Sequence, residues 1–592
     1  MKGLPAALLL LATVACAEAA ELFPTDSRGW TRAAEAVVLT DFSKAEPPSA
    51  LTTGRREKGK WKLVPFATAQ WTGTALSAYW ETEPAVVRLS LPVRGRHAVY
   101  VGLATTSGGF NIGGSGMKAR LSDEPVFKRM ACNLRLLPLR RGVIQEQFLT
   151  VAELNGQSIE IAPLYGLAAT VCYVKLVPVT AEEVRERMRP RHRTAIATFD
   201  GHNWIWPFRP TTRPELLEEF RGFEDTDIGK WWFQVGGADL VCYPSNVGNI
   251  PGEGTADFPT STYAAYTHTL QSLFQKGINP LKVARDAART QGAEFHVMIR
   301  PAGWVGSMPY EETFNSKFFC AHPEWRCVDR DGTPTLYMSY AVPEVRRHVL
   351  EVVRETLALQ PEGVGLLFHR GMPMMLWEEA FCERFRQRHQ ADARTVAEDD
   401  PRLWATRAEI MTEFLTELHA LLDETARAQG RRQRYKISLG TFSQEADNQK
   451  WGLDLPLWIR RGLVDELAVA WFAYHTSFAP PDMAYYRRIT AGTHVGVYPF
   501  VIAWKTGKPQ DLCKKVAEYY AAGASGIAIW DPQVHKGWPD GSPGNAFDVL
   551  SRLGDPDRIA RWARDGVPQP LMIPLTRLDE NYFSRWFPNT GF

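Results

Sequence analysis

From residue 194 onward, one pattern recurs eight times: a short apolar segment, and then a stretch whose apolar residues have helical spacing. Residues 364–368, for example, contain no polar side chain. Strands that are apolar on both faces belong to parallel sheets covered by helices on each side. Parallel strands need right-handed crossovers, and eight βα repeats over roughly 360 residues fit a closed barrel. The pattern therefore predicts an α/β fold, a (β/α)8 TIM barrel, over residues 194–550.

The expected elements follow from where the apolar segments and the helical spacings lie. Between residues 343 and 357, Val345, Val349 and Val353 fall on one face of a helix. Two further stretches, residues 409–422 and 509–522, show the same spacing. The eight strands are expected at residues 194–199, 239–243, 294–299, 364–368, 435–440, 466–471, 494–501 and 526–530.

Residues 21–188 differ from the barrel region, because short runs of β-branched and aromatic residues are separated by glycine and proline clusters. Many short strands without a long helical pattern indicate an all-β sandwich domain. Residues 180–188 are expected to form a short helix with Thr180 as its N-cap. After the barrel, residues 551–592 contain one more helix, at 558–564, and we expect this extension to pack on the barrel.

The N-terminus has the form of a secretory signal peptide over residues 1–19. Lys2 precedes an apolar run at residues 4–15, and residues 17–19 (AEA) fit a cleavage site. Cys16 allows a second interpretation, in which the export signal is that of a lipoprotein. No later run of about 20 apolar residues follows, so we expect no integral membrane span. The protein is therefore expected to be exported, to the periplasm or the extracellular space.

Composition argues against nucleic acid as a partner and does not decide whether the cysteines form disulfides. The net charge is +2 and no basic tract stands out, so nucleic acid is not an expected partner. Seven cysteines follow residue 19, without a CxxC metal pattern. After export, Cys320 with Cys327 and Cys132 with Cys172 are candidates for disulfides, and buried free thiols are the alternative. The oligomeric state is not indicated.

The residues after each barrel strand are informative, because in this fold they surround the catalytic mouth whatever the reaction. Carboxylates, tryptophans, arginines and histidines dominate these positions. Glycoside hydrolysis needs two carboxyl groups at the scissile bond, and aromatic rings stack on the apolar faces of sugars. The sequence has no HxH or HExxH pattern and no Gly-rich phosphate loop after the last two strands, so we expect no metal and no other cofactor. The expected partner is a polysaccharide or oligosaccharide substrate.

Three carboxylates are candidates for catalysis. Glu378 follows the fourth strand and Trp377, whose ring would desolvate the carboxyl and raise its pKa, as a general acid requires. Asp531, directly after the eighth strand, and Glu445, after the fifth, are candidates for the second carboxylate. Each has a structural alternative. Glu378 could be a first-turn helix carboxylate, Asp531 an N-cap or a partner of Arg370, and Glu445 a solvated loop residue.

Other residues at the strand ends are expected to bind substrate through hydroxyl groups, acidic substituents or ring faces. Asp200 is placed among them, because an acid after the first strand often holds a substrate hydroxyl. Arginine stays protonated, so Arg300 and Arg370 are expected to orient carboxylates or to bind substrate. The full set is Asp200, His202, Trp204, Arg300, Trp304, His369, Arg370, Trp377, Tyr474, His475, Trp504 and Trp530.

Several segments recur in the order known from one family. They are residues 322–325 (HPEW), 339–349 (SYAVPEVRRHV), 451–459 (WGLDLPLWI) with 462–465 (GLVD), and 526–531 (GIAIWD). Over about residues 190–550 the chain resembles the glycoside hydrolase family 10-like proteins. The resemblance implies a (β/α)8 fold and hydrolysis of polysaccharide. Many relatives have an aspartate where this chain has Leu367, three residues before Arg370, so either Glu378 replaces that acid or the chemistry is lost.

The interpretation we favour is an exported glycoside hydrolase that cleaves O-glycosidic bonds in a polysaccharide by a two-carboxylate mechanism. Two alternatives stay open. Leu367 favours a non-catalytic glycan-binding barrel. A polysaccharide lyase would use Tyr474 or His475 as its base and Arg300 or Arg370 to neutralise a uronate. The sequence does not determine the sugar, the linkage, endo or exo action, or retention or inversion.

Overall fold

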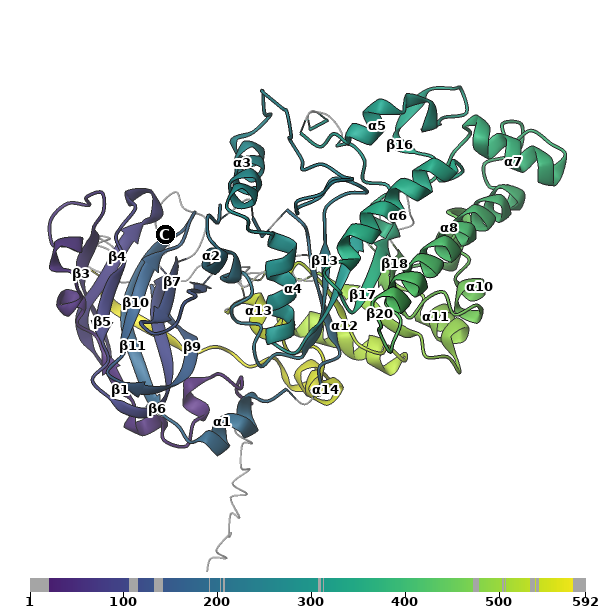
Figure 1. Cartoon of the computed structure of the whole chain (residues 1–592). Helices are drawn as coiled ribbons and strands as arrows, with labels where there is room; N and C mark the ends of the chain where they lie inside the picture. The colour runs from purple at the N-terminus through teal and green to yellow at the C-terminus, as the bar shows by residue number, and fades with distance from the viewer. Residues whose placement is uncertain are drawn as a thin grey trace, which may run out of the picture.

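The structure of the 592-residue chain is a computed structural model. Residues 1–19, with the expected signal peptide and Cys16, lie outside the described residues. A β-rich domain and a barrel are described (Figure 1). The described residues are 21–105, 115–132, 142–190, 192–202, 204–205, 208–306, 310–311, 313–471, 479–502, 505, 507–532, 538, 542 and 544–578.

Eight parallel strands close into a barrel, and the predicted TIM barrel is confirmed. Each strand pairs with the next, and the last strand pairs with the first, so the sheet has no free edge. The carboxyl ends of all eight strands therefore meet at one mouth. The strands are β12 (Ala195–Phe199), β13 (Ile228–Gln234), β14 (Glu294–Ile299), β17 (Gly363–Leu367), β18 (Lys436–Phe442), β19 (Glu466–Ala470), β20 (Gly496–Val501) and β21 (Ala528–Trp530).

The second barrel strand is the one that the sequence pattern placed wrongly. It is β13, whereas the predicted segment at residues 239–243 forms only isolated bridges in a loop. Trp231 of β13 packs in the shell under the helices, while Lys230 and Gln234 make polar contacts inside the barrel. A search for apolar runs does not find this strand, because it contains Lys230 and Gln234.

Helices cover the outside of the barrel. α6 (Pro343–Leu357) occupies the predicted range, with Val345, Val349 and Val353 buried. α8 (Pro401–Ala428) and α12 (Pro509–Ala521) correspond to the other two predicted helices. The remaining elements of this region are α2 (Arg213–Leu217), α3 (Ser261–Gln275), α4 (Pro280–Thr290), α5 (Lys317–Ala321), a hairpin of β15 (Arg326–Val328) and β16 (Pro334–Met338), α7 (Glu379–His389), α9 (Glu445–Lys450), α10 (Leu455–Arg460), α11 (Met483–Thr490) and α13 (Ala546–Leu550).

The β-rich domain is built on a 12-stranded sheet. An apolar cluster that includes Trp61 and Ile161 fills its interior. α1 (Ala181–Met188) leads out of the domain, and the Thr180 hydroxyl caps it by accepting a hydrogen bond from the Glu183 N–H, as predicted. The strands are β1 (Val37–Leu39), β2 (Leu51–Thr52), β3 (Trp61–Thr68), β4 (Thr72–Tyr79), β5 (Val87–Ser90), β6 (Arg94–Thr105), β7 (Ser115–Leu121), β8 (Lys128–Cys132), β9 (Val143–Asn155), β10 (Ser158–Pro163), β11 (Ala168–Pro178) and β22 (Met572–Leu578).

The C-terminal extension divides between the two domains. α14 (Pro556–Asp565) packs on α12 of the barrel. β22 departs from the expected packing on the barrel, because it returns to the β-rich domain and pairs antiparallel with β3 and β9. In Figure 1 it is the yellow strand among the purple and blue ones. Ile573, Leu575 and Leu578 are buried there, so the last strand of the described chain belongs to the core of the first domain.

Ion pairs join the β-rich domain to the barrel. Lys118 of β7 binds Glu218, just after α2, at 2.8 Å. Arg129 of β8 pairs with Glu218 and Glu219, and its guanidinium carbon lies 3.6 Å from the ring centre of Phe208, in the loop after β12. Because Arg129 and both glutamates are buried, removing one partner would leave an uncompensated charge. These contacts hold the two domains in one arrangement.

Side chains inside the barrel form three levels along its axis. On β13, Lys230 belongs to an ion network at the amino end, Trp232 to an apolar cluster in the middle, and Gln234 to the mouth. On β14 and just after it, His296 and Arg300 occupy the first and last of these levels. The order follows from the two-residue period of strands. The apolar middle level closes the barrel below the mouth.

The described cysteines are free thiols, and all of them except Cys320 are buried. Neither pair suggested by spacing is bonded, so the alternative of buried free thiols holds for the described residues. Within those residues, no helix has both the length and the apolar character that a bilayer crossing requires.

Candidate active site at the barrel mouth

Five strand ends bring a polar cluster together at the mouth. Asp531, after β21, accepts a hydrogen bond on Oδ1 from the backbone N–H of Asp200, after β12 (3.0 Å). Arg300 Nη2 donates to Asp200 Oδ2 (2.7 Å), and Arg300 Nε donates to Gln234 Oε1 (2.7 Å). The Arg370 guanidinium carbon lies 5.1 Å from the ring centre of Trp530. We call this set the mouth cluster. Its members are Asp200, Gln234, Arg300, His369, Arg370, Trp530 and Asp531.

Two glycines allow this close approach. A Cβ at Gly201 would lie 2.6 Å from the carbonyl oxygen of Gln234, so glycine is needed where the turn after β12 lies against the end of β13. A Cβ at Gly440 of β18 would lie 2.4 Å from His369 Nδ1, so any larger residue would displace that ring. The His369 ring centre lies 5.7 Å from that of Trp530. The mouth cluster is therefore held by packing as well as by hydrogen bonds.

Asp200 is an ionised carboxylate. Its burial acts to raise the pKa of its carboxyl, but the charges of Arg300 and Arg370 and the hydrogen bond from Arg300 outweigh burial and hold that pKa well below its usual range. His202 also donates its backbone N–H to Asp200 Oδ1 (3.1 Å). An ionised carboxylate is what a glycosidase uses as nucleophile or as stabiliser of an oxocarbenium-like transition state.

The two histidines at the mouth are neutral at physiological pH. Burial lowers the pKa of His202 to about 4, although the charge of Asp200 opposes this. Burial and the nearby charge of Arg370 lower the pKa of His369 well below its ordinary value. The positive charge within the mouth cluster therefore comes from Arg300 and Arg370.

Replacing Arg300 with glutamine is expected to raise the pKa of Asp200, because the charge of Arg300 is the largest effect that holds this pKa down against burial. The acid limb of the kcat/KM profile should move to higher pH. Stability at neutral pH should fall by about 3–5 kcal/mol, the usual result of leaving one buried charge unpaired.

The control is Arg434→Gln, which breaks a pair with Asp465 (2.6 Å) just before β18, at the other end of the barrel. That variant should lose stability and keep the wild-type pH profile. The same pH profile in Arg300→Gln as in wild type would contradict the prediction.

Glu378 lies in a different cluster, immediately before α7. Its carboxylate accepts hydrogen bonds from the Ser339 hydroxyl and from the backbone N–H of Leu376 (3.0 Å to the latter). The residue is only 5% exposed, and burial raises the pKa of the carboxyl despite these hydrogen bonds. The charge of Glu378 acts on Arg407 of α8, and among the described residues no hydrogen bond or ion pair joins the Glu378 carboxylate to the mouth cluster. Its surroundings are those of a buried carboxylate at a helix start.

Four other predicted site residues also lie apart from the mouth cluster. Glu445 begins α9 and pairs with Arg488 of α11 (3.0 Å), on the outside of the barrel. Trp204, Trp304 and Trp377 are buried in packing contacts. Their neighbours are Phe220 for Trp204 (5.5 Å between ring centres), Phe318 for Trp304 (5.9 Å) and the Arg330 guanidinium for Trp377 (4.7 Å). Tyr474, His475 and Trp504 lie outside the described residues.

Leu367 fills the position where many members of the resembled family carry an acid. It is fully buried in the apolar middle level of the barrel, in one cluster with Met298 and Phe500. That position is therefore taken up by apolar packing, and Glu378, at the start of α7 against Ser339, does not occupy it. Gln234 is the mouth residue that the sequence argument missed, because the second strand was expected in another segment. The alternation of Lys230, Trp232 and Gln234 is the signal that could have found it.

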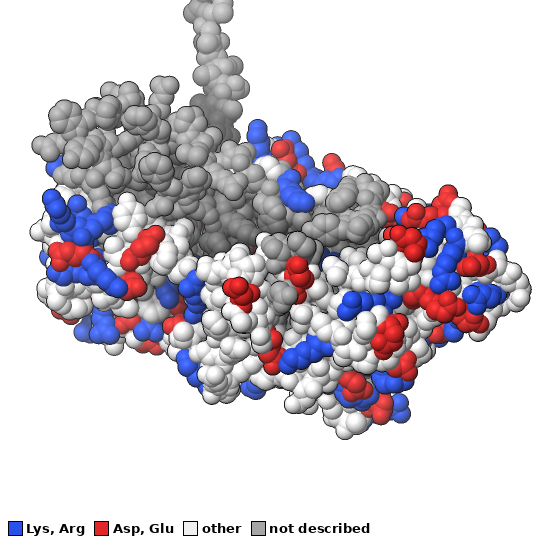
Figure 2. Space-filling view, turned by 90° about the horizontal axis from the view of Figure 1, so that it is seen from above, with Lys and Arg blue, Asp and Glu red and all other residues white. Residues whose placement is uncertain are grey.

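Seen from above, charged side chains of both signs are interspersed over the coloured surface (Figure 2). At the end formed by α7 and α8, for example, Arg384 pairs with Glu409 (3.2 Å). The coloured part of this face shows no basic tract of the kind that a nucleic-acid backbone requires.

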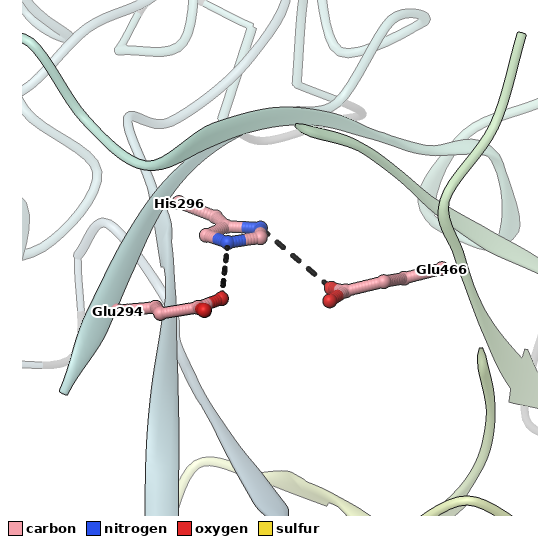
Figure 3. Close-up of side chains that lie close together, drawn as sticks. All are labelled: Glu294, His296 and Glu466. Carbon is pink, nitrogen blue, oxygen red and sulfur yellow. Dashed lines mark hydrogen bonds and ion pairs between the residues drawn. The ribbon is translucent and has the colours of Figure 1, made fainter. Parts of the chain in front are cut away.

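Glu294, His296 and Glu466 are the one group of metal-ligating side chains found among the described residues, near the amino end of the barrel (Figure 3). His296 Nε2 lies 3.3 Å from Glu294 Oε2, and its Nδ1 lies 3.7 Å from Glu466 Oε2. Lys436 Nζ lies 2.8 Å from both carboxylate oxygens of Glu294, and Lys230 pairs with Glu466. Two ammonium groups already neutralise the two carboxylates, so these residues fit a structural ion network better than a metal site.

Replacing Glu294 with glutamine is expected to flatten the acid side of the stability curve. Burial acts to raise the pKa of Glu294, but hydrogen bonds from His296 and Lys436 lower it from an ordinary 4.5 to about 2. A carboxyl with a lowered folded pKa contributes stability that is complete above about pH 4.5 and is lost as the pH falls towards 2. Urea unfolding at several acidic pH values should therefore show a smaller loss than in wild type. Glu424→Gln, at an exposed site on α8, should keep the wild-type slope, and equal slopes in all three proteins would refute the prediction.

No protein-family model and no curated protein matches this chain. Among solved structures, the chain is similar to the catalytic domain of β-amylase from Paenibacillus polymyxa (10% identity, TM-score 0.39, covering 62% of this chain and 99% of that one). It is also similar to TtGalA, the α-galactosidase of Thermus thermophilus (12%, 0.30, 80% and 88%), and to a GH26-CBM35 β-(1,4)-mannanase of Podospora anserina (12%, 0.25, 86% and 98%). These neighbours are glycoside hydrolases, but at such identities and TM-scores they establish no activity for this chain.

Proposed function

We propose that this protein is an exported glycoside hydrolase that cleaves O-glycosidic bonds of a polysaccharide at the barrel mouth. The observation that carries the proposal is that the backbone N–H of Asp200 donates to Asp531 Oδ1, which makes the two aspartates neighbours at the mouth while the Asp200 carboxyl is ionised. A pair of carboxyl groups at one bond is what the two-carboxylate mechanism needs. The signal-like residues 1–19 support export, and the resemblance to glycoside hydrolase family 10-like proteins supports the substrate class.

Asp200 is assigned the role of the ionised carboxylate and Asp531 that of the general acid/base. A carboxylate paired with Arg300 takes up a proton only at low pH, so protonation of the leaving oxygen falls to Asp531. Asp531 has a φ of 44°, a left-handed conformation that residues other than glycine seldom adopt. Such conformations persist only where surrounding contacts impose them, and they concentrate at functional sites.

Trp530 and Arg370 complete the proposed site. Trp530 ends β21, next to Asp531, and although it is only 6% exposed we assign the exposed part of its apolar ring to contact with the C–H groups of a sugar. The guanidinium of Arg370 beside that ring supplies hydrogen-bond donors for hydroxyl or acidic groups. The substrate would thus be oriented by a ring and a cation next to the two carboxylates.

The test is a product assay on a panel of neutral and acidic polysaccharides, with wild type and Asp531→Asn side by side. New reducing ends without ultraviolet absorbance, absent in Asp531→Asn, are the expected result. Binding without any product would support the non-catalytic glycan-binding barrel instead.

A polysaccharide lyase is the second candidate, and a specific observation favours it. The charges of Arg300 and Arg370 both reach Asp200 at the mouth, and His202 is neutral at physiological pH, as a base must be. In that reaction the base removes the proton next to a uronate carboxylate, the bond to the leaving oxygen breaks, and a carbon–carbon double bond forms. Ultraviolet absorbance from unsaturated ends, retained in Asp531→Asn and lost in His202→Ala, would replace the hydrolase assignment with this one.

A further inference from the structure

Rings and guanidiniums from the β-rich domain and from the barrel loop after β12 form one group, in which Tyr79, Tyr165 and Arg209 are exposed and Arg56 and Trp80 are half-buried. We call it the ring–arginine surface, and it comprises Arg56, Tyr79, Trp80, Tyr165 and Arg209. The guanidinium carbon of Arg56 lies 4.3 Å from the ring centre of Tyr79, and that of Arg209 lies 5.2 Å from the ring centre of Tyr165. The ring centres of Trp80 and Tyr165 are 4.3 Å apart. The surface thus joins the end of β4, the loop before β11 and the loop after β12.

The tyrosines of this surface are not part of the core. Tyr79 is 40% exposed and Tyr165 is 37% exposed, and they are the exposed aromatic side chains among the described residues. A guanidinium that lies over a ring is held in place by about 0.5–1 kcal/mol. The N–H groups at the edge of the Arg209 guanidinium match the two oxygens of a carboxylate. The arrangement presents oriented donors beside apolar ring faces.

Arg209 supplies a cation that the described residues do not neutralise. It is exposed, and within the described part of the chain its side chain has no ion pair and no hydrogen bond. Two acidic residues in the loops next to Tyr79 are paired with lysines: Glu57 with Lys60 (2.8 Å) and Glu83 with Lys58 (2.9 Å). An anionic ligand at Arg209 would therefore not compete with these two carboxylates.

The ring–arginine surface is continuous in sequence with the mouth. The Ile205 N–H donates to the His202 carbonyl (3.1 Å), and the Arg209 N–H donates to the Ile205 carbonyl (2.9 Å), so two backbone hydrogen bonds link Arg209 through Ile205 to His202, which contacts Asp200. β11 runs down to α1 at the bottom of Figure 1, so its first residue, opposite Tyr79, lies at the upper end of the domain. That end is on the same side as α3 and α5, which follow strand ends at the mouth.

We infer that the ring–arginine surface binds an acidic polysaccharide chain that continues into the barrel mouth. Arg209 receives a carboxylate group, and the rings of Tyr79, Trp80 and Tyr165 contact the C–H faces of the sugars. The negative charge of such a polysaccharide is also complementary to the positive charge of Arg300 and Arg370 at the mouth. The inference rests on the proposed function only for the class of ligand, since the chain could be bound here whether or not it is cleaved.

The experiment measures binding of the full-length protein to polygalacturonate and alginate by affinity electrophoresis, with galactomannan as the neutral polymer. The variants are Arg209→Ala and Tyr165→Ala. The control is Arg432→Ala, which removes an exposed arginine just before β18, at the opposite end of the barrel. Each surface variant should bind an acidic polymer about five-fold or more weakly, because Arg209→Ala loses a charge-assisted contact and Tyr165→Ala loses a ring contact with the sugar and the ring beneath the Arg209 guanidinium. The control should bind like wild type, and binding should weaken as salt is added. Unfolding temperatures should stay unchanged, since the replaced side chains are exposed.

The outcomes separate this inference from the proposed function. Wild-type affinity for acidic polymers in Arg209→Ala and Tyr165→Ala would overturn it, as would the absence of binding in the wild type. If the surface variants lost affinity for galactomannan to the same extent, the conclusion that the ligand is acidic would be refuted. Binding that depends on Arg209 in a protein that cleaves no polymer would uphold the surface and refute the hydrolase. Cleavage by the wild type, with wild-type binding in both surface variants, would uphold the hydrolase and refute the role of the surface.

Discussion

Asp531→Asn should lower kcat on a cleaved polysaccharide by about 10²–10⁴-fold, the range expected when a general acid/base is removed. The fold should survive, because asparagine adopts a positive φ as readily as aspartate and Asp531 has a φ of 44°. The amide oxygen can still accept the hydrogen bond from the Asp200 N–H. Reducing-end kinetics and thermal unfolding on the same preparations would separate lost chemistry from lost structure.

Glu378→Gln and Glu445→Gln are the matched controls, since each removes one carboxylate that lies outside the mouth cluster. Both should keep kcat within a few-fold of wild type, because neither side chain contacts Asp200 or Asp531 among the described residues. Loss of activity in Glu378→Gln, with wild-type activity in Asp531→Asn, would move the acid/base role to Glu378 and refute the pair proposed here.

Ending the chain after Leu571 should unfold the β-rich domain, although the deletion is at the far end of the sequence from that domain. The deletion removes β22 and with it the buried side chains of Ile573, Leu575 and Leu578. At about 1.5–3 kcal/mol for each buried side chain, roughly 5–9 kcal/mol of stability is lost, which is an upper estimate. That is comparable with the whole stability of a typical domain, about 5–15 kcal/mol. Thermal unfolding and limited proteolysis would show the change.

A chain that ends after Leu578 is the control for that truncation, because it keeps β22 and its pairing with β3 and β9. It should unfold close to the wild-type temperature. If the shorter chain, without β22, resisted protease as well as this control, β22 would be dispensable and the two domains would be less interdependent than the structure indicates.

The barrel could be predicted because most of its strands are short apolar runs that end abruptly, as residues 363–367 do. Burial on both faces leaves few alternatives for such runs. β13 could not be found in this way, because Lys230 and Gln234 are satisfied by partners from distant strands. Lys230 pairs with Glu466, and Gln234 accepts a hydrogen bond from Arg300. A polar residue inside a barrel is tolerated only if a partner meets it, and a single strand does not reveal its partners.

The candidate site was predictable where a residue directly follows its strand. Asp200, Arg300 and Asp531 are of this kind, and the structure brings them together. Residues farther from a strand end were not predictable, because the path of the loop decides the direction of the side chain. Trp304, four residues beyond Arg300, is buried against Phe318. Glu378 lies beyond a proline-containing loop and faces Ser339.

By itself, the sequence determined the fold class and the chemical character of the mouth, since both depend on local patterns. Apolar runs alternate with amphipathic helices, and ionisable groups stand immediately after the strands. The tertiary structure was needed to show which mouth residues are in contact, where the second strand lies, and that β22 completes the first domain. These are contacts between residues up to several hundred positions apart, such as Asp200 with Asp531. Closure of the barrel and packing of the chain ends create such contacts, and a local pattern carries no record of them.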